Sequence, residues 1–299
     1  MKRLLSLLAL TLLSLTVMAN ANSDSVIPSI TGIAYVRIKV SDLDKANAFY
    51  AGKLGLSILN CPADAAKCYF AGPGQEVDLI KTDSPSTQDW IDAIGLYTSD
   101  VSAMRAYLLS HGQKPGELIT DSKGRVHFRV ADPENHAIEF VETKGPVAPM
   151  KPPLLLNMKL IHSGFVVRDR EATDNFYKKL LGFKLYWHGG MKDRETDWVA
   201  MQVPNGTEWI EYMLNIPTSA DQHLLGVMNH ISLGVPDAQA AAKALETAGV
   251  KLTEQPKIGR DGKWQLNLYD PDLTRIELMS YVPAEKPCCS EFTGPHPKP

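Results

Sequence analysis

Apolar and polar residues follow their clearest pattern from residue 160 to residue 183, LIHSGFVVRDREATDNFYKKLLGF. Alternation over residues 160–168 predicts a β-strand, and the apolar periodicity of residues 171–181 predicts an amphipathic helix that a glycine ends. Because strand side chains alternate between two faces, His162 lies opposite the more apolar face and is expected to point away from the helix, toward the concave side of a sheet. The residues that share its face are Leu160, Gly164 and Val166.

The same pattern recurs along the chain. Residues 32–56 repeat the strand, the Asp, the Phe-Tyr pair and the Leu-Gly ending, and residues 92–113 and 229–250 are shorter versions. Similar closing phrases, HFRVADPENHAIEFVE and LNLYDPDLTRIELMS, follow the two shorter versions. Internal repeats dictate architecture, so we expect an α+β fold of four βαβββ modules paired two and two.

The expected elements divide the chain into two domains. Helices are expected at 43–54, 171–181 and 237–248, each after an Asp that supplies an N-cap and before a Gly. The second set of strands is expected near 160–168, 184–188, 197–203, 208–214, 229–235, 264–269 and 274–280. The resulting segments are a first domain at 32–145, a Pro-rich linker at 146–157, a second domain at 158–282 and a Pro-rich tail at 283–299.

Composition and the N-terminus narrow the class of protein. The chain has 299 residues, 44% of them hydrophobic, which is enough for two modest cores, and its net charge of −3 shows no basic footprint for nucleic acid. Residues 1–21 combine two positive charges, a short apolar run and small residues, which is typical of a secretory signal cleaved after Ala21. We therefore expect an exported protein, periplasmic or extracellular, with no membrane span after cleavage.

Export permits disulfides among the four cysteines. Cys61 and Cys68 flank a short segment between two strand-like runs, so they are expected to close a hairpin. Cys288 and Cys289 lie in a tail too poor in apolar residues to fold by itself. Adjacent cysteines can bind soft metals, but a disordered or disulfide-linked tail is the simpler expectation.

Two histidines and two glutamates recur at corresponding points of the second domain. Glu211 follows His162 by 49 residues, and Glu277 follows His230 by 47. Each lies in a predicted strand with apolar neighbours, where an unpaired carboxylate is costly. A lone His or Glu in a strand is usually packed or hydrogen-bonded, but in-register recurrence favours a site for Fe, Ni, Mn, Co or Zn. Four ligands leave two octahedral positions open; with three, Glu211 becomes a base or a substrate contact.

These motifs resemble the vicinal oxygen chelate superfamily, which contains glyoxalase I, extradiol dioxygenases, and fosfomycin- and bleomycin-resistance proteins. The resemblance implies modules that form two half-open β-barrels with a metal in the cleft. It also implies that His162, Glu211, His230 and Glu277 match the ligands of glyoxalase I, while His162, His230 and Glu277 match the iron ligands of the dioxygenases.

The sequence departs from the family pattern in three places. The positions equivalent to the four ligands in the first domain hold Tyr35, Asp78 (uncertain by one residue), Ala93 and Glu139, so that domain is expected to have a degenerate site. The dioxygenases' outer-shell His and Tyr are missing, and Asp261, Gln265 and Asn267 occupy that region. Leu273 stands where a Gly would tolerate positive φ, so the turn must differ or be strained.

Three functions remain open. The first is a glyoxalase-like isomerase or lyase in which a divalent ion polarises two adjacent substrate oxygens and Glu211 or Glu277 moves the proton. The second is an Fe(II) extradiol ring-cleaving dioxygenase, and the third is a non-catalytic small-molecule binding protein. Neither the substrate, nor the metal, nor the oligomeric state follows from the sequence. The side chains expected to line the pocket are Trp198, Met201, Trp209, Gln265 and Asn267.

Overall fold

The computed structural model describes residues 26–62, 65–83, 90–142 and 156–299. The predicted signal at residues 1–21 and most of the predicted linker at 146–157 lie outside these ranges. None of the helices in the described ranges is both long and apolar enough to span a membrane.

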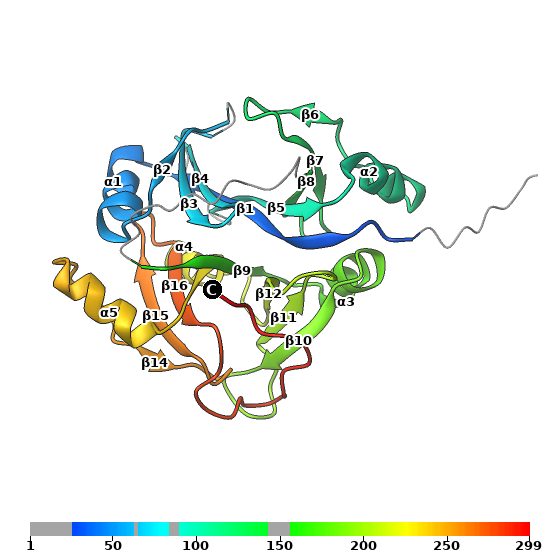
Figure 1. Ribbon diagram of the computed structural model, residues 1–299. Helices are drawn as coiled ribbons and strands as arrows, with labels where there is room; N and C mark the ends of the chain where they lie inside the picture. Colours follow the sequence, from blue (N-terminus) through cyan, green and yellow to red (C-terminus); the bar gives the residue numbers. More distant parts are fainter. Residues whose placement is uncertain (1–25, 63–64, 84–89, 143–155) are drawn as a thin grey trace, which may run out of the picture.

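Two curled eight-stranded sheets, one per domain, form the architecture (Figure 1). The first has the order β2-β3-β4-β1-β5-β8-β7-β6 and the second β10-β11-β12-β9-β13-β16-β15-β14. The α+β fold of four βαβββ modules in two half-open barrels is thereby confirmed. The strands of the first sheet are β1 (Ile30–Val40), β2 (Ile58–Leu59), β3 (Lys67–Gly72), β4 (Gln75–Lys81), β5 (Ile91–Thr98), β6 (Ile119–Thr120), β7 (Val126–Ala131) and β8 (Ala137–Glu142). Those of the second are β9 (Lys159–Val166), β10 (Lys184–Gly189), β11 (Trp198–Gln202), β12 (Trp209–Met213), β13 (His230–Val235), β14 (Lys257–Ile258), β15 (Trp264–Tyr269) and β16 (Arg275–Ser280).

The helices cover the outer faces and begin at Asp caps. Asp42 accepts hydrogen bonds from the backbone of Asp44 and Lys45, and Asp237 caps its helix in the same way. Both Phe-Tyr pairs lie in π-helical turns. Helix α2 falls within the repeat at 92–113, for which no helix bounds were predicted, and α4 was not predicted. The helical segments are α1 (Leu43–Asn47), η1 (Ala48–Lys53), α2 (Val101–Ser110), α3 (Arg170–Asp174), η2 (Asn175–Leu180), α4 (Gln222–Met228) and α5 (Ala238–Thr247).

Strand β9 corrects one detail of the predicted alternation. Ser232 pairs with His162 but the next residue, Leu233, pairs with Leu160, so a β-bulge skips Ile161. A bulge reverses the side-chain parity on one side of it. Leu160 therefore packs in the main core, and Ile161 instead packs in a smaller cluster with Trp209. The predicted face of Leu160 was wrong.

The two domains hold each other through a reciprocal pair of hydrogen bonds. The Tyr50 hydroxyl, from the first Phe-Tyr pair, donates to Asp270 in the second domain (3.0 Å), and the Tyr177 hydroxyl donates to Asp132 in the first (3.0 Å). Strand β1 of the first sheet and strand β9 of the second lie next to each other where the two domains meet (Figure 1). Burial raises the pKa of Asp270 to about 7. Each Phe-Tyr motif thus binds the Asp-Pro turn of the other domain.

The turn after Asp270 contains the backbone strain that the sequence suggested. Leu273 has φ of 70°, while Asn135 occupies the corresponding place in the first domain with φ of 67°. Asn tolerates this left-handed conformation, whereas Leu pays about 1–2 kcal/mol for it. The Asp270 carboxylate accepts hydrogen bonds from the backbone of Asp272 and Thr274 (2.9 Å each), which holds the turn in place.

The tail and the cysteines differ from expectation. Cys61 and Cys68 are free thiols rather than a disulfide, whereas Cys288 and Cys289 are bonded to each other. The tail lies along the edge strand β10, where the Thr293 amide donates to Tyr186 O (3.0 Å). The tail has too few apolar residues to fold alone, but it packs against apolar side chains of the second domain.

Candidate metal centre

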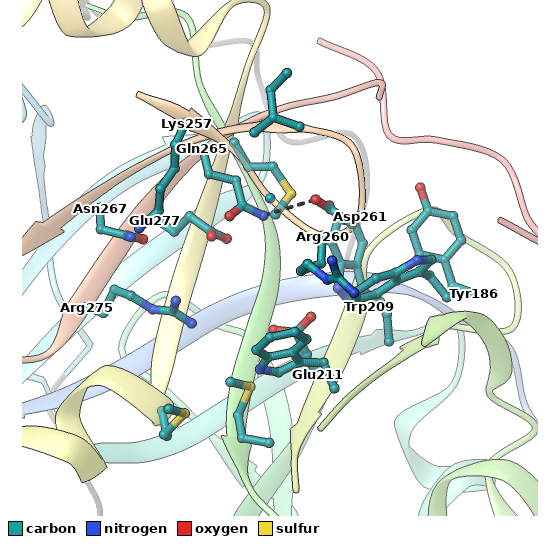
Figure 2. A pocket seen from close by; sticks show the side chains of 18 of the residues that line it. Tyr186, Trp209, Glu211, Lys257, Arg260, Asp261, Gln265, Asn267, Arg275 and Glu277 are labelled. Carbon is teal, nitrogen blue, oxygen red and sulfur yellow. Dashed lines mark hydrogen bonds between the residues drawn. The ribbon is translucent and has the colours of Figure 1, made fainter. Parts of the chain in front are cut away.

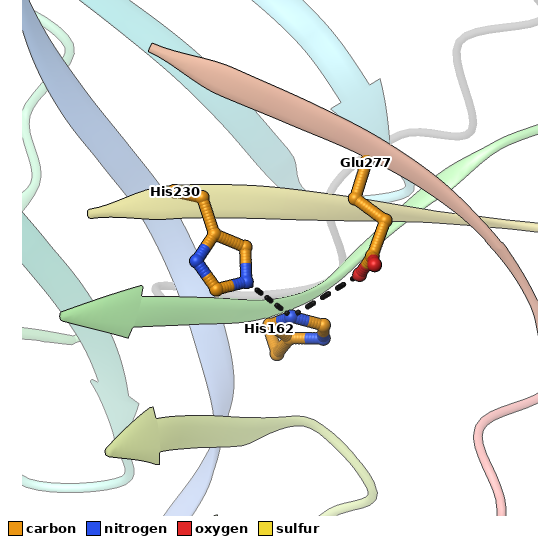
Figure 3. A group of neighbouring side chains, drawn as sticks. All are labelled: His162, His230 and Glu277. Atoms are coloured by element: carbon orange, nitrogen blue, oxygen red, sulfur yellow. Dashed lines mark hydrogen bonds and ion pairs between the residues drawn. The ribbon is translucent and has the colours of Figure 1, made fainter. Parts of the chain in front are cut away.

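Four side chains from four strands converge inside the second barrel. The Nε2 atoms of His162 and His230 lie 3.0 Å apart, and Glu277 Oε2 is 3.5 Å from His162 Nε2 (Figure 3). Glu211 Oε2 lies 3.5 Å from His230 Nε2 and 3.9 Å from His162 Nε2. The structure thus brings together all four residues that the sequence singled out.

Strand register explains the convergence. Glu211 on β12 and His230 on β13 both pair with Gly164 of β9, from opposite sides. Glu277 on β16 pairs with Ser232, which pairs in turn with His162. A Cβ on Gly164 would lie 2.1 Å from His230 Cε1, so only glycine leaves room for that imidazole.

The donor set fits a divalent cation. His230 Nδ1 donates to the Met228 carbonyl (2.9 Å), which leaves the Nε2 lone pair facing the other three groups. Burial holds the pKa of His162 well below its ordinary value and lowers that of His230 to about 3, so both imidazoles are neutral. Glu277 Oε2 is buried with no hydrogen-bond partner among the described residues. Neutral imidazoles and carboxylates in this arrangement are what a borderline metal ion binds.

The buried His230 predicts a pH effect in metal-free protein. Its folded-state pKa of about 3 lies below the ordinary 6.5, so the unfolded chain takes up a proton first as pH falls and stability is lost below pH 6.5. From pH 7 to pH 4 the free energy of unfolding should fall by about 3 kcal/mol more in the unsubstituted protein than in His230→Gln. Chemical denaturation after chelation measures the difference.

Glu211 changes the stability with pH in the direction opposite to His230. The effect of His230 is therefore measured as the difference between the unsubstituted protein and His230→Gln. Burial raises the pKa of Glu211 to about 7, so the folded state holds a proton that the unfolded state releases above pH 4.5, and this contribution grows as pH falls. The two effects partly cancel in the unsubstituted protein. Equal pH dependence in protein and variant would contradict a buried, neutral His230.

A cavity of about 310 Å³ adjoins the four side chains (Figure 2). Glu211 and Glu277 line it, together with the predicted Trp198, Trp209, Gln265 and Asn267. Met201 was wrongly predicted to line it. Trp198 and Ala200 face the cavity, so Met201, an odd number of residues from Trp198, lies on the opposite face of β11 and packs in the main core.

A buried lysine lies behind one wall of the cavity. The Nζ of Lys263 is 4.7 Å from the centre of the Trp209 ring, 5.0 Å from that of Phe292 and 5.3 Å from that of Tyr186. Burial lowers the pKa of Lys263 and raises that of Asp261, which lines the cavity. Phe292 belongs to the tail, so the tail completes this wall.

The first domain holds an ion-pair network at the equivalent positions. Register equates Tyr35 with His162 and Ala93 with His230, and it settles Asp78 as the equivalent of Glu211. It also equates Arg37 with Gly164. With only Ala93 opposite, the Arg37 side chain has room and donates to Glu139 (3.1 Å). Gly164 and His230 of the second domain thus correspond to Arg37 and Ala93 of the first.

The sequence reasoning missed several lining residues. Arg275 precedes Glu277 by two residues in a predicted strand, so the period of two could have placed it on the cavity face. Lys257, Arg260 and Phe292 come from short or irregular segments that carry no such signal.

Comparisons with known proteins agree with this architecture. Residues 159–278 match the family model described as Glyoxalase/Bleomycin resistance protein/Dioxygenase superfamily. No curated protein sequence matches the chain significantly. Three solved structures that are 19–20% identical to it share its fold.

These structures illustrate the likeness. A single-residue variant of homoprotocatechuate 2,3-dioxygenase from B. fuscum has a TM-score of 0.67 and 19% identity over 91% of this chain and 76% of that one. The complex of the Brevibacterium fuscum enzyme with 3,4-dihydroxyphenylacetate has a TM-score of 0.64 and 19% identity over 86% and 82%. A Mn(II)-bound glyoxalase from Novosphingobium aromaticivorans has a TM-score of 0.65 and 20% identity over 85% and 83%.

Proposed function

We propose that this chain, whose residues 159–278 match the glyoxalase, bleomycin-resistance and dioxygenase family model, is a divalent-metal-dependent isomerase or lyase of the glyoxalase kind. Its substrate would be a small molecule with two adjacent oxygens. The observation that carries the proposal is the meeting of two neutral imidazoles and two carboxylates beside a cavity. Two carboxylates rather than one favour this function over that of a dioxygenase.

The residues divide the work as follows. His162, Glu211, His230 and Glu277 would hold the metal, which supplies Lewis-acid polarisation of the substrate oxygens. Glu211 Oε2 would accept and return a proton between adjacent substrate carbons, because Glu211 lies in the cluster and also lines the cavity where the substrate would bind. Trp198 and Trp209 line the cavity and exclude water from that transfer.

The second candidate is an Fe(II) ring-cleaving dioxygenase with His162, His230 and Glu277 as ligands. One specific observation favours it: these three residues form a compact candidate site whose ligand atoms all lie within 4.8 Å of one another. In that case Glu211 would be a base or a substrate contact. The cavity offers Asp261, Gln265 and Asn267 where the dioxygenases have His and Tyr, which counts against it.

Replacing Glu211 by glutamine separates the candidates. For the isomerase or lyase we expect at least about 100-fold lower turnover of methylglyoxal and a weaker hold on Ni, Zn, Mn or Co, because a ligand and a base are both lost. For the dioxygenase we expect iron to remain and oxygen to be consumed with catechol. The exposed Glu171→Gln is the matched control. Protein without any stoichiometric divalent ion would indicate a binding module instead.

Export remains part of the proposal. It rests on the signal-like residues 1–21 and is supported by the disulfide of Cys288 and Cys289, since such bonds persist in oxidising compartments.

A further inference from the structure

Arg275 is a cation that faces the cavity next to the candidate metal centre. It precedes Glu277 by two residues on β16, so both side chains project from the same face of the strand. Both line the cavity, and Figure 2 shows the Arg275 guanidinium pointing into it on the side of Glu277, across from Arg260. Its positive charge lowers the pKa of His230, which places it within electrostatic reach of the centre.

Burial raises the pKa of Glu211 and the charge of this guanidinium, acting at longer range, lowers it, but the described residues give the guanidinium no direct counter-ion. Arg275 Nε is buried without a hydrogen-bond partner, and no carboxylate in the described part of the chain forms an ion pair with it. The other cavity cations differ, since Arg260 pairs with Asp193 and Lys257 with Glu254 (3.3 Å). Buried polar groups are nearly always hydrogen-bonded, so an exception in a binding cavity points to a ligand.

Charge balance gives the sign of that ligand. The two carboxylates would offset the charge of one divalent cation, and the two imidazoles are neutral. The positive charge of Arg275 then has no counterpart in the centre. Arginine stays protonated in proteins, so it cannot relieve this by losing a proton. A partner with one negative charge would make the loaded cavity neutral.

We propose that Arg275 binds a carboxylate of the substrate, so that the substrate is an anionic molecule with two further oxygens for the metal. This rests on the proposed function and names its substrate class. A guanidinium holds a carboxylate through two parallel hydrogen bonds, which fixes orientation as well as charge.

Two ligands that differ by one carboxylate test this inference. Full-length protein loaded with Co(II) is titrated at pH 7 with catechol and with 3,4-dihydroxybenzoate, and the visible spectrum reports binding. We expect the carboxylate to tighten binding at least about tenfold, the equivalent of 1.4 kcal/mol. Arg275→Met should reduce the ratio of the two dissociation constants to about one, and Arg275→Lys should restore part of it. Lys178→Met, which removes an exposed cation that does not line the cavity, should leave the ratio unchanged.

The outcomes distinguish this inference from the function beneath it. An unchanged ratio in Arg275→Met, with cobalt and catechol still bound, overturns the inference alone. Protein that takes up no cobalt overturns the proposed function and the inference with it, whereas cobalt-loaded protein that binds neither ligand overturns the inference alone. Cobalt content is measured for every variant, and if Arg275→Met does not load, Arg275→Gln and Arg275→Lys provide the ratio.

Discussion

Replacing both His162 and His230 by alanine is expected to weaken divalent-metal binding by more than about 100-fold. Losing an outer-shell partner of a ligand already costs about 10–100-fold, and here two ligands are lost directly. Equilibrium dialysis of the full-length protein against Zn or Mn, followed by elemental analysis, measures the effect. The exposed His223→Ala serves as the matched control and should bind metal normally.

Retention of stoichiometric metal by the double variant would contradict the proposed centre. A second group of possible ligands lies in the second domain, since Asp193 and the two tail cysteines would offer a carboxylate and two thiolates once the disulfide is reduced. Metal that persists in the double variant but disappears in Cys288→Ser with Cys289→Ser would move the site to the tail.

Replacing Gly164 by alanine should have the next largest effect, although glycine carries no donor atom. The new Cβ would lie 2.1 Å from His230 Cε1 and 2.5 Å from its Nδ1, so the imidazole must move. His230 is buried and held by the Met228 carbonyl, which leaves it little space for that movement. We expect at least about tenfold weaker metal binding and a loss of about 1–3 kcal/mol in stability.

Gly52→Ala is the control for this prediction. A Cβ at Gly52 meets no other atom within 4 Å and Gly52 lies in a helical turn, so this variant should match the unsubstituted protein in metal content and should lose no stability. Normal metal affinity in Gly164→Ala would show that His230 is not required where the structure places it.

The sequence was sufficient for the architecture because the information was repeated. Four strand-helix openings and two Asp-Pro closings each specify the same module, so an error in one does not alter the fold. The in-register spacing of His162, Glu211, His230 and Glu277 likewise predicted their convergence, since equivalent positions of paired modules meet about a local twofold.

Other features depend on contacts that no local pattern contains. The reversal at Leu160 results from a bulge set by pairing with β13, and the tail is ordered by Tyr186 and β10 rather than by its own composition. The position of Met201, in contrast, could have been excluded from the sequence, because it cannot share a face with Trp198.

The reciprocal hydrogen bonds between the domains give the first domain a structural role, although it has no metal ligands equivalent to the two histidines. Tyr50 holds Asp270 in the strained turn that leads into the strand carrying Arg275 and Glu277. A protein shortened to the second domain would expose the Asp270 carboxyl group to solvent. The turn would also lose the hydrogen bond from Tyr50. The first domain, without histidines at the ligand positions, would therefore support the second domain mechanically, and the metal centre would depend on both halves of the chain.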